Sequence, residues 1–436
     1  MAAKIITGID VGSSKISVVI AQVAPEEDKI SVVGASSFPS QGVRKGQVVN
    51  IDEATQSIIS GVEAAERMAG YSVSKTLVAI GGAHLASQNS KGVVAVAEPE
   101  GEINEEDIKR VIEAARAVSL PSSREIIHCL PRYFTVDSQE GIKDPVGMTG
   151  VRLEVETHII TGSSTSIKNV VKCISEIGAN IEAVVFNGIA AAEAVLTETE
   201  KELGVVLVDI GGGTTDIVIF IEGSPAYATV LPVGAKNVTN DLAIGLRLSL
   251  ENAEKLKLAL SQEPKKPVEP ESKKENNEED KEEEKKDEID LSAVGIEEER
   301  KTISRKTLVE GIIKPRLNEI FTLVGIEMKK SGFAGMTPSG IVITGGGALT
   351  IGITEACKRT LAMPVRIGQP MGVSGLIDDI GSPAFAVVTG LILYGSKSGG
   401  FGTAKSSLPV FSKIAHKIPV KGLAIKMIDL IKSFLP

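Results

Sequence analysis

Two distant stretches of the chain share one pattern of apolar and polar positions. In each, an apolar run leads into an aspartate, a short turn of small residues follows, and a second apolar run begins, at residues 8–20 and 208–219. In an alignment without gaps, Asp10 falls on Asp209 and the second apolar runs coincide. Small residues between two apolar runs predict a β-hairpin in each copy.

The two turns have the chemistry of a phosphate site. Glycine and serine let backbone N–H groups approach a phosphate closely, hydroxyls add donors, and Lys15 adds a positive charge. The candidate phosphate-binding residues are Gly12, Ser13, Ser14, Lys15, Gly211, Gly212, Gly213, Thr214 and Thr215. Asp10 and Asp209 suit a Mg²⁺ ion that keeps its waters, so they are candidate metal residues acting through water. The pair of turns could clamp one nucleotide; two ordinary glycine-rich hairpins are the alternative.

Two further segments fit a nucleoside beside these phosphates. The apolar run at 341–344 predicts a strand that enters a glycine cluster and then a helix, an arrangement that allows close backbone approach. The cluster consists of Gly345, Gly346, Gly347 and Ala348. Glu254 and Lys257 lie three apart, so they share a helix face and could contact a ribose or adenine edge. A solvated helix face is the alternative for this pair.

Helical spacing marks three other segments. Residues 53–68 carry apolar positions at Ile58, Ile59, Val62 and Ala65. A helix is expected at about 105–118, with Asn104 as its N-cap and acidic residues in its first turn. Another is expected at 165–177, after a strand-rich block at 83–163.

An acidic stretch at 262–290 interrupts this pattern. It holds 13 acidic residues, seven lysines and three prolines, without an aromatic residue. Such a composition cannot bury enough apolar surface to order itself, which predicts a disordered loop.

The end of the chain has its own pattern. Residues 396–417 predict a flexible linker, and 418–436 predict an amphipathic helix with lysines on its polar face. At 100° per residue, one apolar arc includes Val420, Leu423, Met427, Ile428, Ile431, Phe434 and Leu435. Such a helix can lie in a membrane interface with its lysines toward anionic headgroups. A terminal helix docked on the protein's own core is the alternative.

Composition narrows the picture only slightly. With 42% hydrophobic residues but 3% aromatics and no Trp, the cores must be aliphatic, as in buried α/β sheets. A net charge of −9 argues against a general nucleic-acid binder. Three scattered cysteines favour a reducing cytoplasm. We expect no signal peptide, because the chain leads straight into the first hairpin, and no apolar run reaches transmembrane length.

The order of two phosphate hairpins, a helix pair and a glycine turn resembles the actin-like ATPase superfamily, which includes actin, heat-shock chaperones and sugar kinases. Within it, the phrases at 202–209, 232–243 and 315–321 resemble the FtsA family of bacterial division proteins. The resemblance implies an α/β fold: a two-lobed actin-like ATPase of duplicated ribonuclease-H-like lobes, with an α+β subdomain inserted in the first lobe. The implied segments are 1–82, 164–196 and 375–395 for the first lobe, 83–163 for the insertion, and 197–374 for the second lobe.

By the same resemblance, the chain is expected to bind ATP with Mg²⁺, self-associate into filaments, and tether the division tubulin FtsZ to the cytoplasmic side of the cell membrane at the septum, among other divisome proteins. It places an FtsZ C-terminal peptide near a helix at 304–321, with Arg300, Arg305 and Arg316 as carboxylate partners. These arginines could instead be solvated or paired internally.

Hydrolysis is expected to be slow at most. Asn187 stands where the superfamily often has a residue that orients the attacking water, and an amide cannot act as a base. A sugar or acid kinase of the same superfamily, with Asp209 as base, is the alternative function, and a chaperone ranks last.

Overall fold

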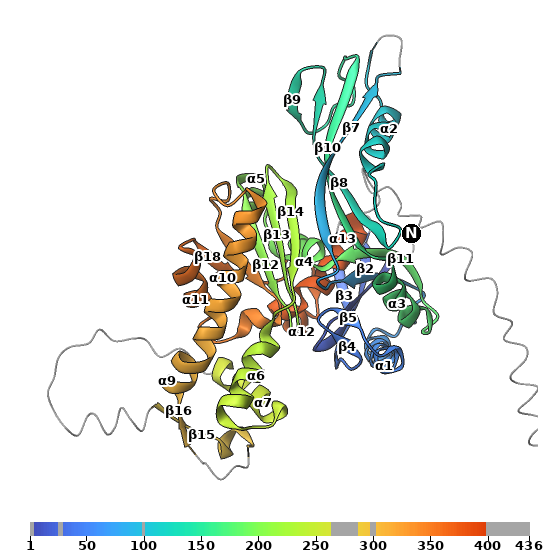
Figure 1. Ribbon diagram of the computed structural model, residues 1–436. Helices are drawn as coiled ribbons and strands as arrows, with labels where there is room; N and C mark the ends of the chain where they lie inside the picture. The colour runs from blue at the N-terminus through green and yellow to red at the C-terminus, as the bar shows by residue number, and fades with distance from the viewer. Residues whose placement is uncertain (1–3, 25–28, 98–100, 263–286, 297–301, 398–436) are drawn as a thin grey trace, which may run out of the picture. The chain divides into compact units, whose positions relative to one another are not determined.

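Six strands form a mixed sheet around the first predicted hairpin (Figure 1). The computed structural model of the chain describes residues 4–24, 29–97, 101–262, 287–296 and 302–397. The sheet has the order β11 (Asn180–Phe186), β6 (Lys75–Ile80), β1 (Lys4–Val11), β2 (Lys15–Ala24), β3 (Lys29–Pro39) and β19 (Ser374–Gly375). The first three strands of the chain are antiparallel neighbours, whereas β6 and β11 run parallel to β1. The first hairpin is therefore confirmed.

A second sheet repeats this arrangement. It has the order β14 (Ser224–Leu231), β13 (Thr215–Ile221), β12 (Val205–Ile210), β17 (Ile341–Thr344) and β18 (Val365–Ile367). Again three antiparallel strands are followed by two parallel ones, so the order matches β3-β2-β1-β6-β11. Every residue of β12 and β13 is buried, which explains why these strands are continuous apolar runs rather than alternating ones. The second hairpin is confirmed, and the two lobes are duplicates.

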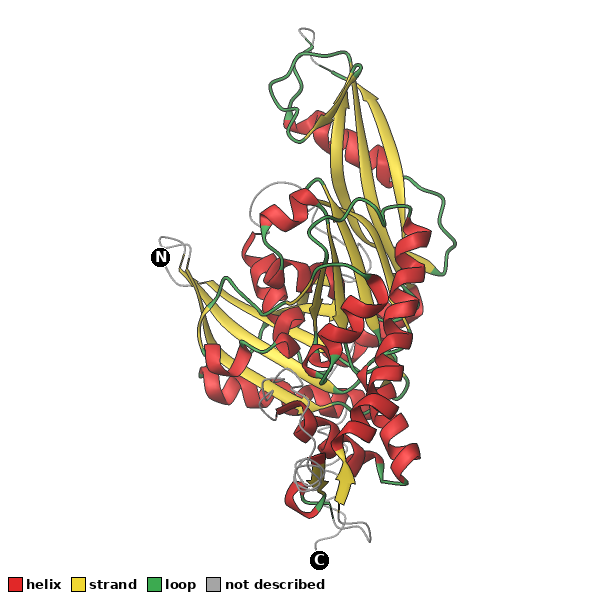
Figure 2. Cartoon of the chain, turned by 90° about the vertical axis from the view of Figure 1, so that its left-hand side faces the viewer, coloured by secondary structure: helices red, strands yellow, loops and turns green. Residues whose placement is uncertain are grey.

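A smaller antiparallel sheet follows the first lobe's strand β6. Its order is β7 (Ala86–Ala95), β10 (Arg152–Ser163), β8 (Arg124–Val136) and β9 (Gln139–Ile142). Helix α2 (Glu105–Arg116) lies along one face of this sheet, as Figure 2 shows. Asn104 caps the helix, as the sequence predicts, and it also forms a reciprocal capping box with Asp107. The helix ends two residues earlier than expected.

Helices of the first lobe follow their predicted spacing closely. Helix α1 (Ile51–Ala69) begins at the cap of Asn50 and ends at Gly70, whose φ of 70° favours glycine. Helix α3 (Ser164–Ser175) begins after Ser163. The remaining helices that cover this lobe are α4 (Asn187–Val195), α12 (Ile377–Ile380) and α13 (Ala386–Lys397).

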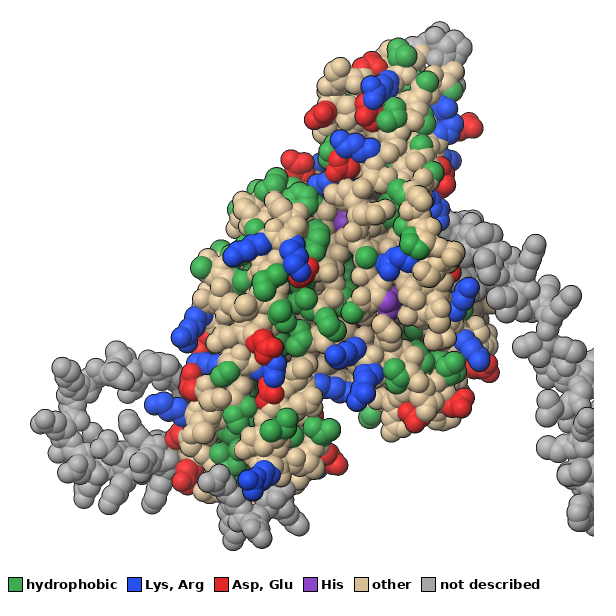
Figure 3. Space-filling view, in the orientation of Figure 1, with side chains coloured by type: hydrophobic (Ala, Val, Ile, Leu, Met, Phe, Trp, Pro, Cys, Tyr) green, Lys and Arg blue, Asp and Glu red, His purple; other side chains and the backbone are tan. Residues whose placement is uncertain are grey.

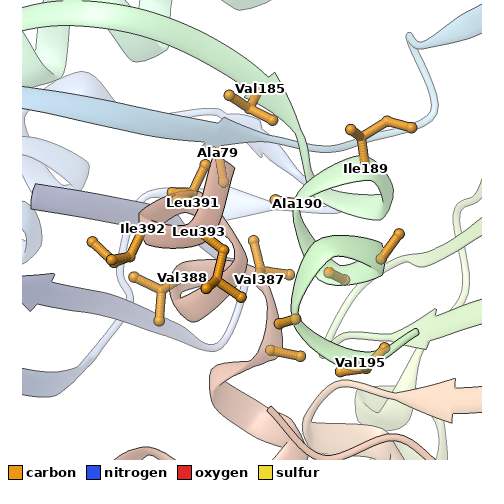
Figure 4. Packing of buried hydrophobic residues seen from close by; sticks show 14 of the residues in the cluster. Ala79, Val185, Ile189, Ala190, Val195, Val387, Val388, Leu391, Ile392 and Leu393 are labelled. Atoms are coloured by element: carbon orange, nitrogen blue, oxygen red, sulfur yellow. The ribbon is translucent and has the colours of Figure 1, made fainter. Parts of the chain in front are cut away.

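A large buried cluster lies where α4 and α13 pack against each other (Figure 4). Gly390 of α13 approaches the backbone of α4 so closely that a Cβ there would lie 1.7 Å from the carbonyl oxygen of Ala190. Only glycine fits at this crossing. The cluster also includes Val195, Val218 and Val342, so residues from both lobes share one core.

The second lobe contains several helices. They are α5 (Glu198–Leu203), α6 (Ala235–Leu246), α7 (Leu250–Gln262), α9 (Arg305–Leu308), the π-helical η2 (Val309–Ile313), α10 (Lys314–Ser331) and α11 (Ile353–Leu361). The helix expected at 304–321 is thus longer and contains a π-helical turn. Pro315 has no N–H to donate to the carbonyl of Gly311, which disrupts the regular helical ladder at this point.

The predicted disorder of 262–290 is wrong at both ends. Gln262 is the last residue of α7. Strand β15 (Glu288–Asp290) pairs with β16 (Thr302–Ser304), and the neighbouring Asp287 accepts a hydrogen bond from the hydroxyl of Ser304 at 2.6 Å. Composition missed this strand because its partner lies beyond the acidic stretch. Residues 263–286 lie outside the described residues, and the segment boundaries drawn from the sequence stay predictions.

Candidate functional site

The tips of the two hairpins meet. Each turn closes on one backbone hydrogen bond, from Gly12 to Lys15 at 3.1 Å and from Gly211 to Thr214 at 2.9 Å. A Cβ at Gly212 would lie 1.9 Å from Oγ of Ser14. The absence of a side chain at Gly212 therefore lets backbones from the two lobes come together.

A cavity lies between the hairpins. Its volume of about 230 Å³ is several times the ~30 Å³ that one water molecule occupies in the liquid, so it has room for a small ligand. The predicted residues that line it are Asp10, Gly12, Ser13, Ser14, Lys15, Asn187, Asp209, Gly211, Gly212, Gly213, Thr214, Glu254, Lys257, Gly345, Gly346 and Gly347. Residues from five distant segments thus converge, as the sequence pattern indicated.

Two predicted phosphate or nucleoside residues do not reach this cavity. Thr215 is the first residue of β13, is completely buried, and donates its hydroxyl to the carbonyl of Val233 at 2.8 Å. Successive strand residues point to opposite faces, so Thr214 faces the cavity and Thr215 faces the core. Ala348 is buried in the core of the second lobe.

The glycine turn packs directly on the second hairpin. Gly345 has a φ of 81°, and a Cβ there would lie 2.1 Å from Oδ1 of Asp209. The turn continues as the 3₁₀-helix η3 (Gly346–Leu349), and the α-helix that follows begins only at Ile353. The predicted strand and turn are confirmed, but the helix starts later than expected.

Buried carboxyl groups are the main electrostatic feature of the site. Burial raises the pKa of Asp10 to about 6, against the pull of Lys15. Burial, and then the charge of Asp10, raises the pKa of Asp209 to about 7. Burial and the charges of Asp209 and Asp10 raise the pKa of Asp216 well above its ordinary value. Burial lowers the pKa of Lys15, while the two aspartates oppose that change.

These carboxyl groups fit a hydrated divalent ion. Asp209 and Asp216 are buried, and Oδ1 of Asp216 has no hydrogen-bond partner among the described residues. A nearby cation would favour the charged form of these groups. Mg²⁺ usually keeps several waters and uses one or two carboxylates together with phosphate oxygens. Within the described ranges, no three His, Cys, Asp or Glu side chains are grouped to hold a metal directly.

Glu254 and Lys257 line the cavity from α7. Nζ of Lys257 donates to Oε2 of Glu254 at 2.7 Å and to the hydroxyl of Thr239 at 2.9 Å. Lys257 is buried despite its charge, so the sequence alternative of a solvated helix face does not hold for it. The pair is fixed at the cavity wall by α6 and α7.

Asn187, the candidate water-orienting residue, begins α4 at the cavity wall. Its Oδ1 is buried and finds no hydrogen-bond partner in the described part of the chain. Its amide packs against Gly81, where a Cβ would lie 2.6 Å from Nδ2. The side chain is therefore held in place with an acceptor still available, which suits a bound water.

Sequence reasoning missed several residues that line the cavity, among them Asp216, Lys236 and Gly46. Asp216 could have been found by counting residues around the second turn, because the register pairs it directly with Asp209. Lys236 and Gly46 carried no such local signal.

The predicted partner arginines have different environments. Arg316 binds Asp241 through two hydrogen bonds at 2.6 and 2.9 Å and also pairs with Glu319, so the internal-pair alternative holds for it. Arg305 begins α9 and donates to the carbonyl of Leu260 at 3.5 Å. Arg300 and the predicted membrane helix lie outside the described residues. None of the described helices is both long and apolar enough to cross a membrane.

Two duplicated sheets with a shared cavity at their hairpin tips define a protein of the actin-like ATPase fold, as the sequence predicts. A model of the SHS2 domain inserted in FtsA matches residues 82–161, and a model of cell division protein FtsA matches 206–390. The chain is 37% identical over 418 residues to cell division protein FtsA of Pseudomonas aeruginosa, covering 96% of this chain and 95% of that protein. The chain belongs to the FtsA family of cell division proteins.

Two further comparisons concern the family and the fold. Cell division protein FtsA of Borreliella burgdorferi is 39% identical over 417 residues, covering 96% of both chains. A solved chain of the PilM-PilN type IV pilus biogenesis complex superposes with a TM-score of 0.57 at 17% identity, covering 90% of this chain and 98% of its own. At that identity, the second likeness supports the fold alone.

Proposed function

We propose that the protein binds ATP with Mg²⁺ between its lobes, polymerises at the cytoplasmic face of the membrane, and holds FtsZ filaments there during division. The observation that carries the proposal is the pair of matched hairpins whose tips meet over a cavity lined by acidic and basic side chains. Family membership supports the role in division.

In this proposal the phosphates lie against the hairpin tips. The backbone N–H group of Gly213 lies in the second turn, and hydroxyls from Ser13, Ser14 and Thr214 are further donors at the wall. Asp10 and Asp209 hold Mg²⁺ through water. Glu254 and Lys257 face the ribose or the adenine, beside the glycine turn at 345–347.

Turnover is proposed to be slow. Asn187 can orient a water through its free acceptor, but its amide cannot take a proton at neutral pH. ATP then acts mainly as a ligand that favours the closed, polymer-forming arrangement of the lobes. Filaments that require ATP should consequently persist long after mixing.

The membrane role rests on the sequence of 418–436. A helix with an apolar arc on one side and lysines on the other suits a membrane interface. Each lysine near an anionic surface contributes about 1 kcal/mol to the free energy of membrane binding. The linker that the sequence predicts, whose first two residues belong to α13 (Ala386–Lys397), would let this segment reach a membrane surface. The proposed location is therefore peripheral, at the septal membrane.

Vesicle sedimentation tests the anchor. Phe434→Glu puts a charge in the apolar arc and removes about 1.5–3 kcal/mol of burial, so binding to anionic vesicles should fall about tenfold or more. Ser433→Glu, its matched control on the polar face, should cost far less. If both variants lose vesicle binding equally, the helix does not lie in the interface as proposed. If the unaltered protein and both variants fail to sediment with vesicles, a soluble kinase is favoured instead.

A binding assay tests the FtsZ surface. Arg305, the first residue of α9, is the candidate that it tests for contact with a carboxylate of the FtsZ C-terminal peptide. Arg305→Glu should weaken peptide binding while ATP affinity stays unchanged. Arg67→Glu, an exposed charge reversal on α1, is the matched control. If Arg305→Glu binds the peptide as tightly as the unaltered protein does, Arg305 is not part of the FtsZ site.

A further inference from the structure

Helix α6 is attached rigidly to the second hairpin. The backbone N–H groups of its first two residues, Ala235 and Lys236, donate to the carbonyls of Gly211 and Gly212, each at 2.9 Å. Gly234 makes this approach possible, because a Cβ there would lie 2.6 Å from the oxygen of Gly211. The start of α6 must therefore move with the second tip.

The side chain of Lys236 crosses to the other lobe. Its Nζ donates to the carbonyl oxygen of Ser13, at the first tip, at 2.6 Å. Ser13 is itself held, since its Oγ accepts a hydrogen bond from the backbone of Gly46 at 2.8 Å. Gly46 lies in the turn between β4 (Val43–Arg44) and β5 (Gln47–Val48). A single residue thus bonds to both hairpins.

Lys236 also differs from the other two lysines at the cavity wall. Lys15 lies beside Asp10 and Asp209, with its Nζ 4.0 Å from the ring centre of Phe385. Lys257 is paired with Glu254. Lys236, by contrast, forms no ion pair within the described residues. Figure 3 shows Lys and Arg side chains gathered where Figure 1 has β4. Around Lys236, the negative charge of Glu254 is opposed by the positive charges of Lys257 and Arg44.

We propose that Lys236 is a phosphate-binding residue that ties the nucleotide to the closure of the two lobes. The inference rests on the proposed ATP site and assigns a role within it. An ammonium group has three donors, and only one is used by Ser13, so the others can bind phosphate oxygens at the meeting point of the tips. A phosphate there would be held by one residue that contacts both lobes.

The charge and the hydrogen bond can be separated by substitution. Lys236→Met removes both, whereas Lys236→Gln keeps a donor for the carbonyl of Ser13 without the charge. Lys255→Met is the matched control, because Lys255 lies on α7 and pairs with Glu251 on the outer surface. Titration of the full chain with ATP and Mg²⁺ gives the affinity of each variant.

Both Lys236 variants should weaken ATP binding by about tenfold, the loss expected for one charge-assisted contact, while the control binds as the unaltered protein does. Hydrogen exchange adds a second measurement: ATP should protect residues 12–15 in the unaltered protein and much less in Lys236→Met. Thermal melting without ATP checks that each variant is folded.

The outcomes distinguish this inference from the proposed function. If the unaltered protein binds no ATP, the proposed function itself fails. If it binds ATP and Lys236→Gln binds equally well, the phosphate role is wrong and Lys236 serves only the contact with Ser13. If a folded Lys236→Met binds ATP normally, neither the phosphate nor the closure role stands.

Discussion

The two hairpins are equivalent in position and different in charge. Alignment of Asp10 with Asp209 also aligns Lys15 with Thr214 and Ser17 with Asp216. In the first hairpin, the register places Asp10 opposite Ser17. In the second, it places two carboxyl groups opposite each other, at Asp209 and Asp216. The first copy thus has one acid and one base where the second has two acids.

This difference distinguishes the features that both hairpins share from the acidic pair that only the second hairpin has. Both copies keep the apolar strands and the tight turn, which form the hairpin, and both keep the first aspartate, which is a candidate metal residue. Like charges directly opposite each other on adjacent strands are destabilising, so the acidic pair of the second hairpin is a cost to stability. We infer that the pair is kept for the cation that accompanies a nucleotide.

The largest effect is expected from a side chain at the meeting point of the hairpins. Gly212→Val should abolish ATP binding, because a Cβ at 212 would lie 1.9 Å from Oγ of Ser14 and would force the tips apart. Titration with ATP and Mg²⁺ measures the loss, and circular dichroism reports whether the strands remain.

Gly211→Ala is the graded control for this substitution. The nearest atom to a Cβ at 211 is the carbonyl oxygen of Thr214 at 3.3 Å, a tight but tolerable distance. ATP binding should survive with a smaller loss. If the two variants bind ATP equally, contact between the tips does not form the site.

A smaller effect is expected from neutralising one acid. Asp209→Asn should raise the melting temperature at pH 8, measured without nucleotide or divalent ion, and the gain should shrink at pH 5. Asp10→Asn should give a smaller gain at pH 8, because only one acid lies in the first hairpin. The same Asp209 variant should lose affinity for ATP with Mg²⁺.

The sign follows from the raised pKa values. An acid with a higher pKa in the folded state keeps its proton there over a pH range in which the unfolded chain has lost it, so it favours folding at low pH. That benefit is lost as pH rises, up to about 6 for Asp10 and about 7 for Asp209. A melting difference that is the same at pH 5 and pH 8 would contradict the buried acidic cluster.

The sequence predicted well those features that are formed by residues close together in the chain. The hairpins, the cap of α2 and the strand before the glycine turn depend on residues a few positions apart, so patterns of polarity and turn residues reveal them. The candidate cavity residues were found because the hairpin pattern occurs twice. Asp216 was within reach of the same reasoning, since the register places it opposite Asp209.

What the sequence could not predict depends on distant partners. Lys236 meets Ser13 across 223 residues, and Gly390 packs on Ala190 across the crossing of α13 and α4. Strand β15 looked disordered because its own composition is acidic, although it pairs with β16. No local pattern encodes such contacts, because each depends on how separate elements pack.

The smallest effect is expected at Thr215, which the sequence predicted at the phosphate site and which lies in the core instead. Its counterpart in the first hairpin is Ile16, which is completely buried. Thr215→Val keeps the shape but loses the hydrogen bond to Val233, so unfolding free energy should fall by about 1–3 kcal/mol while ATP affinity is unchanged. Thr214→Val should do the reverse, with a few-fold loss of ATP affinity and little change in melting. Chemical denaturation and ATP titration of both variants measure these two effects. If only Thr215→Val loses ATP affinity, Thr215 contributes to the nucleotide site and its assignment to the core is wrong.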